Sequence, residues 1–249
     1  MLRLLSPLVA DGPTQMAWDE ALLETAAQPT LRLYRWDPPC VSLGYFQDHA
    51  SATAGLPPGM PVVRRITGGG AIWHEHEVTY ALVGRLGADG LPGRTVELYP
   101  LLHGAVLAEL ATRAPALQAQ PATVGDRRYA AEPRCFASPA AADLVHAGGG
   151  KVLGSAARAR GERLLVHGSL KLASNPWDGP AVRGCGLDAE AAAQALVAGI
   201  AAALGLAVSA GSPTAAETAA MQRLRALRYG TGDADGAAAW VRERQGPRA

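Results

Sequence analysis

Hydrophobic residues recur along the chain with two different periods, which predict its strands and helices. Alternation, or a run rich in β-branched and aromatic residues, predicts strands at 2–5, 31–36, 40–47, 62–63, 72–73 and 77–83. Asp11-Gly12-Pro13 supplies a capping aspartate and a first-turn proline, so a helix begins there and ends at Gln28-Pro29. We expect the strand at 77–83 to pair with the strand before it in the chain.

The second half of the chain has the same mixture of elements. Apolar spacing predicts a helix over 95–114, followed by a mobile polar loop at 116–134 over one end of a sheet. Short turns separate strands at 143–147, 151–158 and 163–172, so these strands form two hairpins. Helices at 188–204 and 214–228 and a frayed tail containing Trp240 follow. No repeat or change of composition marks a boundary, so we expect one domain, 1–249, with a helical C-terminal part at 188–249.

The charge balance limits the possible partners. The chain has 249 residues, 23 basic and 22 acidic, with a net charge of +1. Because like charges are not clustered, we expect neither a nucleic-acid nor an anionic-membrane partner. The chain shows no long apolar span, and its first residues are too short and broken for a signal peptide, so we expect a cytoplasmic protein. Three widely separated cysteines, Cys40, Cys135 and Cys185, argue against a disulfide framework and against a CxxC zinc site.

The most site-like stretch lies between the strands at 62–63 and 72–73. Three consecutive glycines at 68–70 remove every Cβ from this turn, so the backbone can adopt positive φ and a ligand can approach the main chain. Arg64 and Arg65 come just before the turn. One interpretation is a pocket floor of backbone N–H groups with guanidinium groups available to an anionic or carbonyl ligand. The alternative is a flexible hairpin turn.

Lysine is rare in this chain, because only Lys151 and Lys171 among the 23 basic residues are lysines. A lysine retained against this bias suggests a need for a compact amine, and the alternative is chance. If the first hairpin brings Lys151 beside Cys135, the ammonium favours the thiolate and Cys135 can accept an acyl group. The alternative is a small, buried, structural cysteine. No metal-ligand spacing connects the histidines, for which structural polar roles are the more frequent: His74, His146 and His167.

Four motifs occur in order along the first 175 residues. They are Gly44-Tyr45-Phe46-Gln47, Arg64-Arg65-x-Thr67-Gly68-Gly69-Gly70-Ala71-x-x-His74, Lys151-Val152-x-Gly154-Ser155-Ala156 and His167-Gly168-Ser169-Leu170. Together they resemble the biotin/lipoate protein ligase superfamily, in its lipoate–protein ligase and octanoyltransferase branch. This resemblance implies an α/β (α+β) fold, in which a mixed, largely antiparallel sheet flanked by helices cradles a C8 acyl chain.

The segment Cys135-Phe136-x-x-Pro139 resembles the cysteine-dependent octanoyltransferases of that branch. The resemblance implies that Cys135 attacks the octanoyl thioester of acyl carrier protein, while Lys151 favours the thiolate and polarises the carbonyl. A lysine of a lipoyl domain or of glycine cleavage H protein then receives the acyl group. It further implies a monomer that needs no cofactor and no metal. The residues expected to bind substrate are Arg64, Arg65, Gly68, Gly69, Gly70, Ala71, His74, Gly154, Ser155, His167 and Gly168.

Two alternatives remain open. Gly68-Gly69-Gly70-Ala71 is closer to the motif of the ligases, which use ATP and Mg to form lipoyl-AMP. Ala140-Ala141-Ala142 stands where transferases tend to carry larger residues, and an extra glycine lengthens the turn before Lys151. The other alternative is a non-catalytic module that binds an acyl group or a carrier protein, in which Cys135 is structural.

Overall fold

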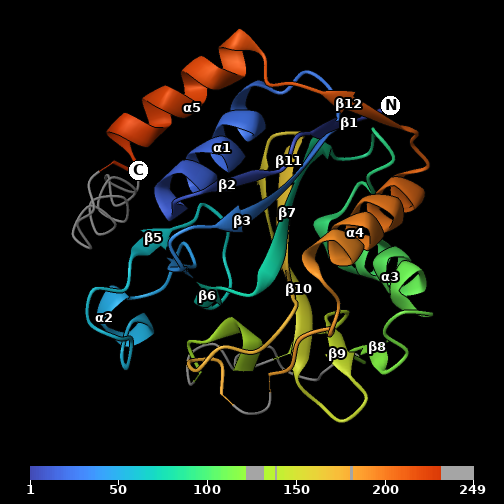
Figure 1. Ribbon diagram of the computed structural model, residues 1–249. Coiled ribbons are helices and arrows are strands. Elements are labelled where there is room, and N and C mark those ends of the chain that lie inside the picture. Colours follow the sequence, from blue (N-terminus) through green and yellow to red (C-terminus); the bar gives the residue numbers. More distant parts are fainter. Residues whose placement is uncertain (122–131, 138, 180–181, 231–249) are drawn as a thin grey trace, which may run out of the picture.

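The structure is a computed structural model, and it describes residues 1–121, 132–137, 139–179 and 182–230. The main sheet contains β1 (Leu2–Leu5), β2 (Leu8–Ala10), β3 (Thr30–Trp36), β7 (Glu77–Arg85), β8 (Leu117–Ala119), β9 (Leu144–His146), β10 (Lys151–Arg160), β11 (Arg163–Lys171) and β12 (Val208–Gly211). Their order is β12-β1-β3-β7-β11-β10-β9-β8, with β2 beside β3 (Figure 1). Neighbours from β3 to β8 are antiparallel, whereas β1 and β2 pair in parallel. The predicted mixed, largely antiparallel sheet is therefore confirmed.

Helices cover both faces of the main sheet (Figure 1). Helices α1 and α5 lie over one face, called here the α1 face, and α3 and α4 lie over the other, the α3 face. On β7, Tyr80 and Leu82 belong to the core of the α3 face, whereas Ala81 and Val83 belong to the core of the α1 face. Strand alternation thus divides neighbouring residues between two cores. The helices are α1 (Gly12–Thr25), α3 (Leu98–Leu110), α4 (Ala189–Leu204) and α5 (Ala215–Leu227).

Short polar residues cap the N-termini of α1, α4 and α5. The side chain of Asp11 accepts a hydrogen bond from the backbone N–H of Thr14 at the start of α1. Thr214 and Glu217 form a reciprocal capping box at the start of α5. Helix α4 ends at Gly205, which has a left-handed φ of 63°. Across the described residues, no helix combines the length and the apolar character needed to span a membrane.

A smaller sheet lies beside the main one and carries the glycine-rich stretch. It consists of β4 (Cys40–Leu43), β5 (Val62–Arg64) and β6 (Ile72–His74), in the order β5-β4-β6. The short helix α2 (His49–Ala52) follows β4. Because β5 and β6 both pair with β4, the glycine stretch passes from one edge of this sheet to the other.

Several predictions about strands are wrong. The strand expected over 40–47 ends at Leu43, because the chain turns where the N–H of Gln47 donates to the carbonyl of Gly44. The alternative of a hairpin turn for the glycine stretch is also excluded, since β5 and β6 do not pair with each other. Strand β7 pairs with β3 and β11, not with the preceding β6. Hydrophobic pattern identifies a strand, but its partner depends on the packing of the whole chain.

Other elements were missed because they are too short to show a period. Strands β2 and β12 and helix α2 have only three or four residues each. Strand β8 lies inside the segment 116–134 that was expected to be loop, and residues 122–131 of that segment lie outside the described residues. The helix expected over 95–114 begins as the 3-10 turn η1 (Thr95–Glu97), and α3 ends at Leu110. The predicted tail with Trp240 also lies outside the described residues.

Candidate active site

A cavity lies against the α1 face of the main sheet. Four residues that are direct neighbours in the strand pairing contribute to it: Gly154 on β10, Ser169 on β11, Thr79 on β7 and Tyr34 on β3. The cavity therefore runs straight across four strands. The other lining residues are Met16, Trp36, Ser42, Arg65, Gly69, Ile72, His74, Cys135, Ser155, Ala156, His167 and Gly168.

Cys135 lines this cavity and lies beside Lys151. It begins the 3-10 turn η3 (Cys135–Ala137), and its Sγ is 3.3 Å from Lys151 Nζ. Lys151 Nζ is also 2.8 Å from Asp143 Oδ2, which accepts a hydrogen bond from the backbone N–H of Ala140. Lys151 is only 2% exposed, so its ammonium interacts with the thiol and the carboxylate with little screening by water. Such a neighbour stabilises a thiolate.

Missing side chains at two glycines allow the cysteine and the lysine to approach the site. A Cβ at Gly154 would lie 2.1 Å from Lys151 Cε, so only glycine leaves room for the lysine stem. A Cβ at Gly70 would lie 2.8 Å from the backbone nitrogen of Cys135. That nitrogen donates to the carbonyl of Ala71 at 2.8 Å, which ties η3 to the end of the glycine stretch.

The glycine stretch has one position with a positive φ. Gly69 has a φ of 90°, and Gly68 and Gly70 are not among the described residues with positive φ. The carbonyl of Gly69 would lie 1.9 Å from a Cβ at Gly44, so the first motif also needs a glycine for close packing. The expectation that the turn uses positive φ therefore applies to a single residue.

Arg64 and Arg65 hold the backbone around this stretch. Arg64 Nη1 donates to the carbonyls of Gly44, Tyr45 and Gln47. Arg65 donates to the carbonyls of Ser42, Gly68 and Gly70 at 3.0, 2.7 and 2.7 Å. Both guanidinium groups therefore hold main-chain carbonyls in place. Direct contact of either arginine with substrate stays a prediction.

A buried hydrogen-bond chain connects Arg65 with Glu77 through His74. Arg65 Nη1 donates to Ser42 Oγ at 3.1 Å, Ser42 Oγ is 2.7 Å from His74 Nε2, and His74 Nδ1 is 2.6 Å from Glu77 Oε1. The ring of His74 also stacks on Trp36 with centroids 3.8 Å apart. Burial lowers the pKa of His74, and Glu77 opposes this effect. Burial alone would raise the pKa of Glu77, but His74 and Lys171 lower it to about 2, so this carboxylate is ionised.

His167, on β11 of the main sheet, forms a hydrogen bond to Thr67, which immediately precedes the three glycines. Its Nδ1 is 2.8 Å from Asp19 Oδ2, and its Nε2 is 2.6 Å from Thr67 Oγ1. Because a carboxylate only accepts, Nδ1 carries a proton and donates to Asp19. Asp19 in turn accepts from Arg32 and from the hydroxyl of Tyr34.

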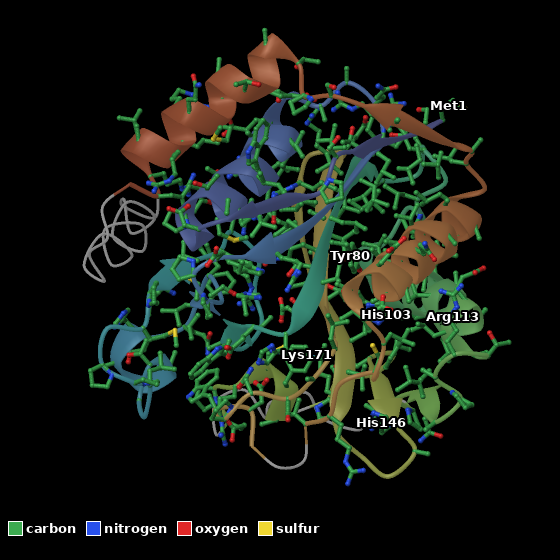
Figure 2. All side chains as sticks on the ribbon, viewed as in Figure 1. Met1, Tyr80, His103, Arg113, His146 and Lys171 are labelled. Carbon is green, nitrogen blue, oxygen red and sulfur yellow. The ribbon has the colours of Figure 1, made fainter. Side chains whose placement is uncertain are left out.

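Ser155 contributes to the cavity differently from the prediction. It pairs with Gly168 across the strands, and its hydroxyl is 2.7 Å from both Tyr80 Oη and His103 Nε2. Tyr80 belongs to the core of the α3 face, and His103 comes from α3 (Figure 2). The hydroxyl of Ser155 therefore points to the face opposite the cavity, because side chains alternate along a strand.

The structure brings most of the predicted site residues together. Eight line the cavity: Arg65, Gly69, His74, Cys135, Gly154, Ser155, His167 and Gly168. Arg64, Gly68, Gly70, Ala71 and Lys151 lie around it without being lining residues. Sequence reasoning missed Asp143, Glu77 and Asp19, whose partners are distant in sequence or on another strand. Within the described residues, no group of three His, Cys, Asp or Glu side chains is arranged to hold a metal ion.

The chain belongs to the lipoyl protein ligase A/B catalytic domain family, which it matches over residues 11–182. It is 37% identical over 183 residues to an octanoyltransferase LipM of Moorella thermoacetica, covering 71% of this chain and 67% of that protein. It is 36% identical over 187 residues to an octanoyltransferase LipM of Kyrpidia tusciae, covering 70% and 67%. The matched region thus spans about two thirds of each relative.

Solved structures show the same fold at lower identity. A putative lipoate protein ligase of T. acidophilum with bound lipoic acid superposes with a TM-score of 0.73 at 21% identity, covering 92% of this chain and 96% of that one. A lipoate-protein ligase A bound with ATP superposes with a TM-score of 0.72 at 22% identity, covering 92% and 95%. At these identities the likeness establishes the fold, and the chemistry depends on the side chains of this chain.

Proposed function

We propose that this chain is a protein octanoyltransferase that carries the octanoyl group as a thioester on Cys135. The observation that supports it best is the 3.3 Å approach of Cys135 Sγ to the buried Lys151 Nζ at the cavity. Its similarity to octanoyltransferases supports the same reaction. A thiolate beside an ammonium is a good nucleophile toward a thioester carbonyl, and Cys135 lines the cavity.

The reaction then has two balanced halves. In the first, Cys135 Sγ attacks the carbonyl carbon of an octanoyl thioester of acyl carrier protein, and the carrier's sulfur leaves and takes up a proton. In the second, the neutral amine of a lysine on a lipoyl domain or H protein attacks the Cys135 thioester. An amide forms, the C–S bond breaks, and the amine proton is released as the Cys135 thiolate is restored. Lys151 stabilises negative charge on sulfur in both halves.

The position of Asp143 supports a donor role for Lys151. With its Nζ between Asp143 Oδ2 at 2.8 Å and Cys135 Sγ at 3.3 Å, the ammonium is held in one place while the sulfur changes its charge. A preorganised donor loses little energy to reorganisation during the reaction. On this mechanism the transfer needs neither ATP nor a metal ion, because the acyl group arrives already activated as a thioester.

The test is to incubate the protein with octanoyl-acyl carrier protein and to measure its mass. We expect one octanoyl adduct that hydroxylamine removes and that is absent from Cys135→Ser. Adding a lipoyl-domain or H-protein acceptor should discharge the adduct and leave an octanoyl amide on the acceptor. A wild-type protein without an adduct would refute the proposal. Pyrophosphate release that depends on ATP and lipoate would instead indicate a ligase.

A further inference from the structure

The second lysine of the chain is buried in a cluster of its own. Lys171 lies at the end of β11 (Figure 2). Its relative exposure is 0%. Its Nζ is 3.2 Å from Glu77 Oε2 and 3.2 Å from Asp178 Oδ2, and it donates to the carbonyl of Trp73 at 2.5 Å. A buried ammonium is costly unless it is paired in this way. The charge is therefore fully compensated by protein groups.

Glu77 connects this lysine to the glycine stretch. Its Oε1 accepts from Thr79 Oγ1 at 2.7 Å and from Ser169 Oγ at 2.8 Å, and it is the oxygen that contacts His74. Its Oε2 faces Lys171. Through Oε1, Glu77 is therefore connected by hydrogen bonds to His74, Ser42 and Arg65, and Arg65 donates to the carbonyls of Gly68 and Gly70. Through Oε2, it contacts the ammonium of Lys171.

Lys171 also reaches the turn that carries the nucleophile. Its Nζ lies over the ring of Phe136 at 5.0 Å from the centroid, and Lys151 Nζ lies over the same ring at 5.4 Å. Phe136 follows Cys135 in the chain and is only 1% exposed. Cation–π contacts of this length are attractive and strengthen when water is excluded. The residue next to the nucleophile is therefore held by both lysines of the protein.

We propose that Glu77 and Lys171 form a positioning pair that couples the glycine stretch to the Cys135 turn and sets the reactivity of the thiol. Neither residue lines the cavity, so each acts through others: Glu77 through His74, and Lys171 through Phe136. The inference rests on the proposed function only in taking Cys135 as the acyl acceptor. Thiol reactivity can be measured without any acyl donor, so the two proposals can fail separately.

The test exploits the opposite charges of the two residues. Within the described residues, the charged and titratable groups near Cys135 include Lys151, Asp143, Arg134, Tyr99 and, across Phe136, Lys171. Arg65, His74 and His167 line the same cavity. Lys171→Met removes a positive charge and leaves the carboxylates of Glu77 and Asp178 without their cation. The cluster becomes more negative, which disfavours the Cys135 thiolate. Glu77→Gln removes a negative charge, so Lys171 is paired with Asp178 alone. The cluster becomes less negative, which favours the Cys135 thiolate. Alkylation of Cys135 by iodoacetamide, followed by mass spectrometry of its peptide, should shift its pH midpoint up in the first variant and down in the second, each by roughly one unit.

Opposite shifts separate positioning from general damage, because both variants lower stability by breaking a buried pair. Arg3→Met is the matched control, since Arg3 is 6% exposed and pairs with Glu217 outside the site. It should lower the melting temperature and leave the alkylation midpoint unchanged. Shifts in the same direction, or none in either variant, would overturn the proposal.

The double variant Glu77→Gln/Lys171→Met covers the case in which a single variant fails to fold. It removes both charges and leaves no uncompensated member of the pair, so it should be more stable than the less stable single variant. We expect its alkylation midpoint within about half a unit of wild type, but octanoyl transfer slowed roughly tenfold, because the glycine stretch and the Cys135 turn are no longer coupled. A double variant with the transfer rate of wild type would overturn the proposal.

Discussion

The two lysines of this protein occupy similar surroundings and differ in one partner. Lys171 lies between two carboxylates, Glu77 and Asp178, at 3.2 Å each. Lys151 lies between one carboxylate, Asp143, at 2.8 Å and the thiol of Cys135 at 3.3 Å. When the thiol ionises, the Lys151 cluster acquires the charge pattern that the Lys171 cluster has with both carboxylates ionised. The second cluster shows that this fold can bury a lysine among acidic groups.

The partners of the two lysines also lie on different kinds of element. Lys171 and Glu77 are directly paired on β11 and β7, so the strand ladder fixes them. Cys135 lies in the turn η3, and Asp143 lies in the turn before β9. Loops held by a rigid scaffold commonly carry reactive groups, whereas central strands carry groups that support them. The reactive cluster is therefore built where side chains can approach a substrate, and the supporting cluster where they cannot.

We expect the largest effect on the transfer rate from Lys151→Met, which removes the ammonium and keeps a side chain of similar length. If the comparison is right, Asp143 is then left unpaired beside the thiol and the thiolate loses its donor. We expect the rate of octanoyl-enzyme formation to fall about 10²–10⁴-fold, which rapid-quench mass spectrometry measures. A fall of less than tenfold would mean that Lys151 acts only indirectly on the thiol, as is proposed for Lys171.

The next effect concerns Gly154→Ala, which places a methyl group where the Lys151 stem lies, 2.1 Å from Cε. The lysine must move away from the thiol, and misplacement of a catalytic group by about 1 Å can cost on the order of 10²-fold in rate. Gly148→Ala is the matched control, because a Cβ there would meet nothing within 4 Å. The idea fails if the two alanine variants transfer octanoate at the same rate.

Part of this site could be predicted from sequence, and the reasons differ from residue to residue. The hairpin through Gly148–Gly150 follows from turn chemistry, so the approach of Lys151 to Cys135 was foreseeable. The irregular pairing between Lys151 and Leu153 was not, because a bulge has no clear signature in the sequence. The main-chain role of Arg65 was also hidden, since a guanidinium beside glycines looks the same whether it binds an anion or a carbonyl.

The supporting cluster was harder still to foresee. Sequence spacing indicates that Glu77 and Lys171 lie on strands, but their pairing depends on β7 and β11 becoming neighbours, which the strand pattern did not establish. The alternation in 77–83 and 163–172 identifies both strands correctly. Strand order arises from packing of the whole chain, so a cross-strand ion pair becomes visible only in three dimensions.

A moderate effect is expected for Asp143→Asn, which makes the Lys151 cluster less like the Lys171 cluster. The ammonium then has only the sulfur as an anionic partner, so the thiolate is favoured and alkylation of Cys135 should speed up a few-fold below neutral pH. Octanoyl transfer should slow several-fold, because Lys151 is less firmly held. Slower alkylation in this variant would show that Asp143 acts mainly by keeping the lysine in place.

The smallest expected effect is on stability, and it concerns His103 on α3, which holds the turn before Asp143. His103 Nδ1 donates to the carbonyl of Ala142 at 2.7 Å, and the hydroxyl of Ser155 donates to its Nε2. Burial lowers the pKa of His103 from its usual value of 6.5, and the hydrogen bond to the carbonyl of Ala142 and the charge of Asp143 oppose this effect only in part. The unfolded chain therefore binds more protons at this histidine than the folded protein. Its contribution to stability is complete above the usual pKa and is lost as the pH falls below it.

We therefore expect the melting temperature of wild type to fall between about pH 7 and pH 5 more steeply than that of His103→Gln. At pH 7 the variant should be less stable by about 1 kcal/mol, since glutamine replaces the two hydrogen bonds imperfectly. Below pH 6.5 the two curves should converge, because wild type alone must protonate this buried ring. Parallel curves would show that His103 contributes nothing to the pH dependence. The position of Asp143, like that of Glu77 on its strand, would then not depend on a group that titrates in this range.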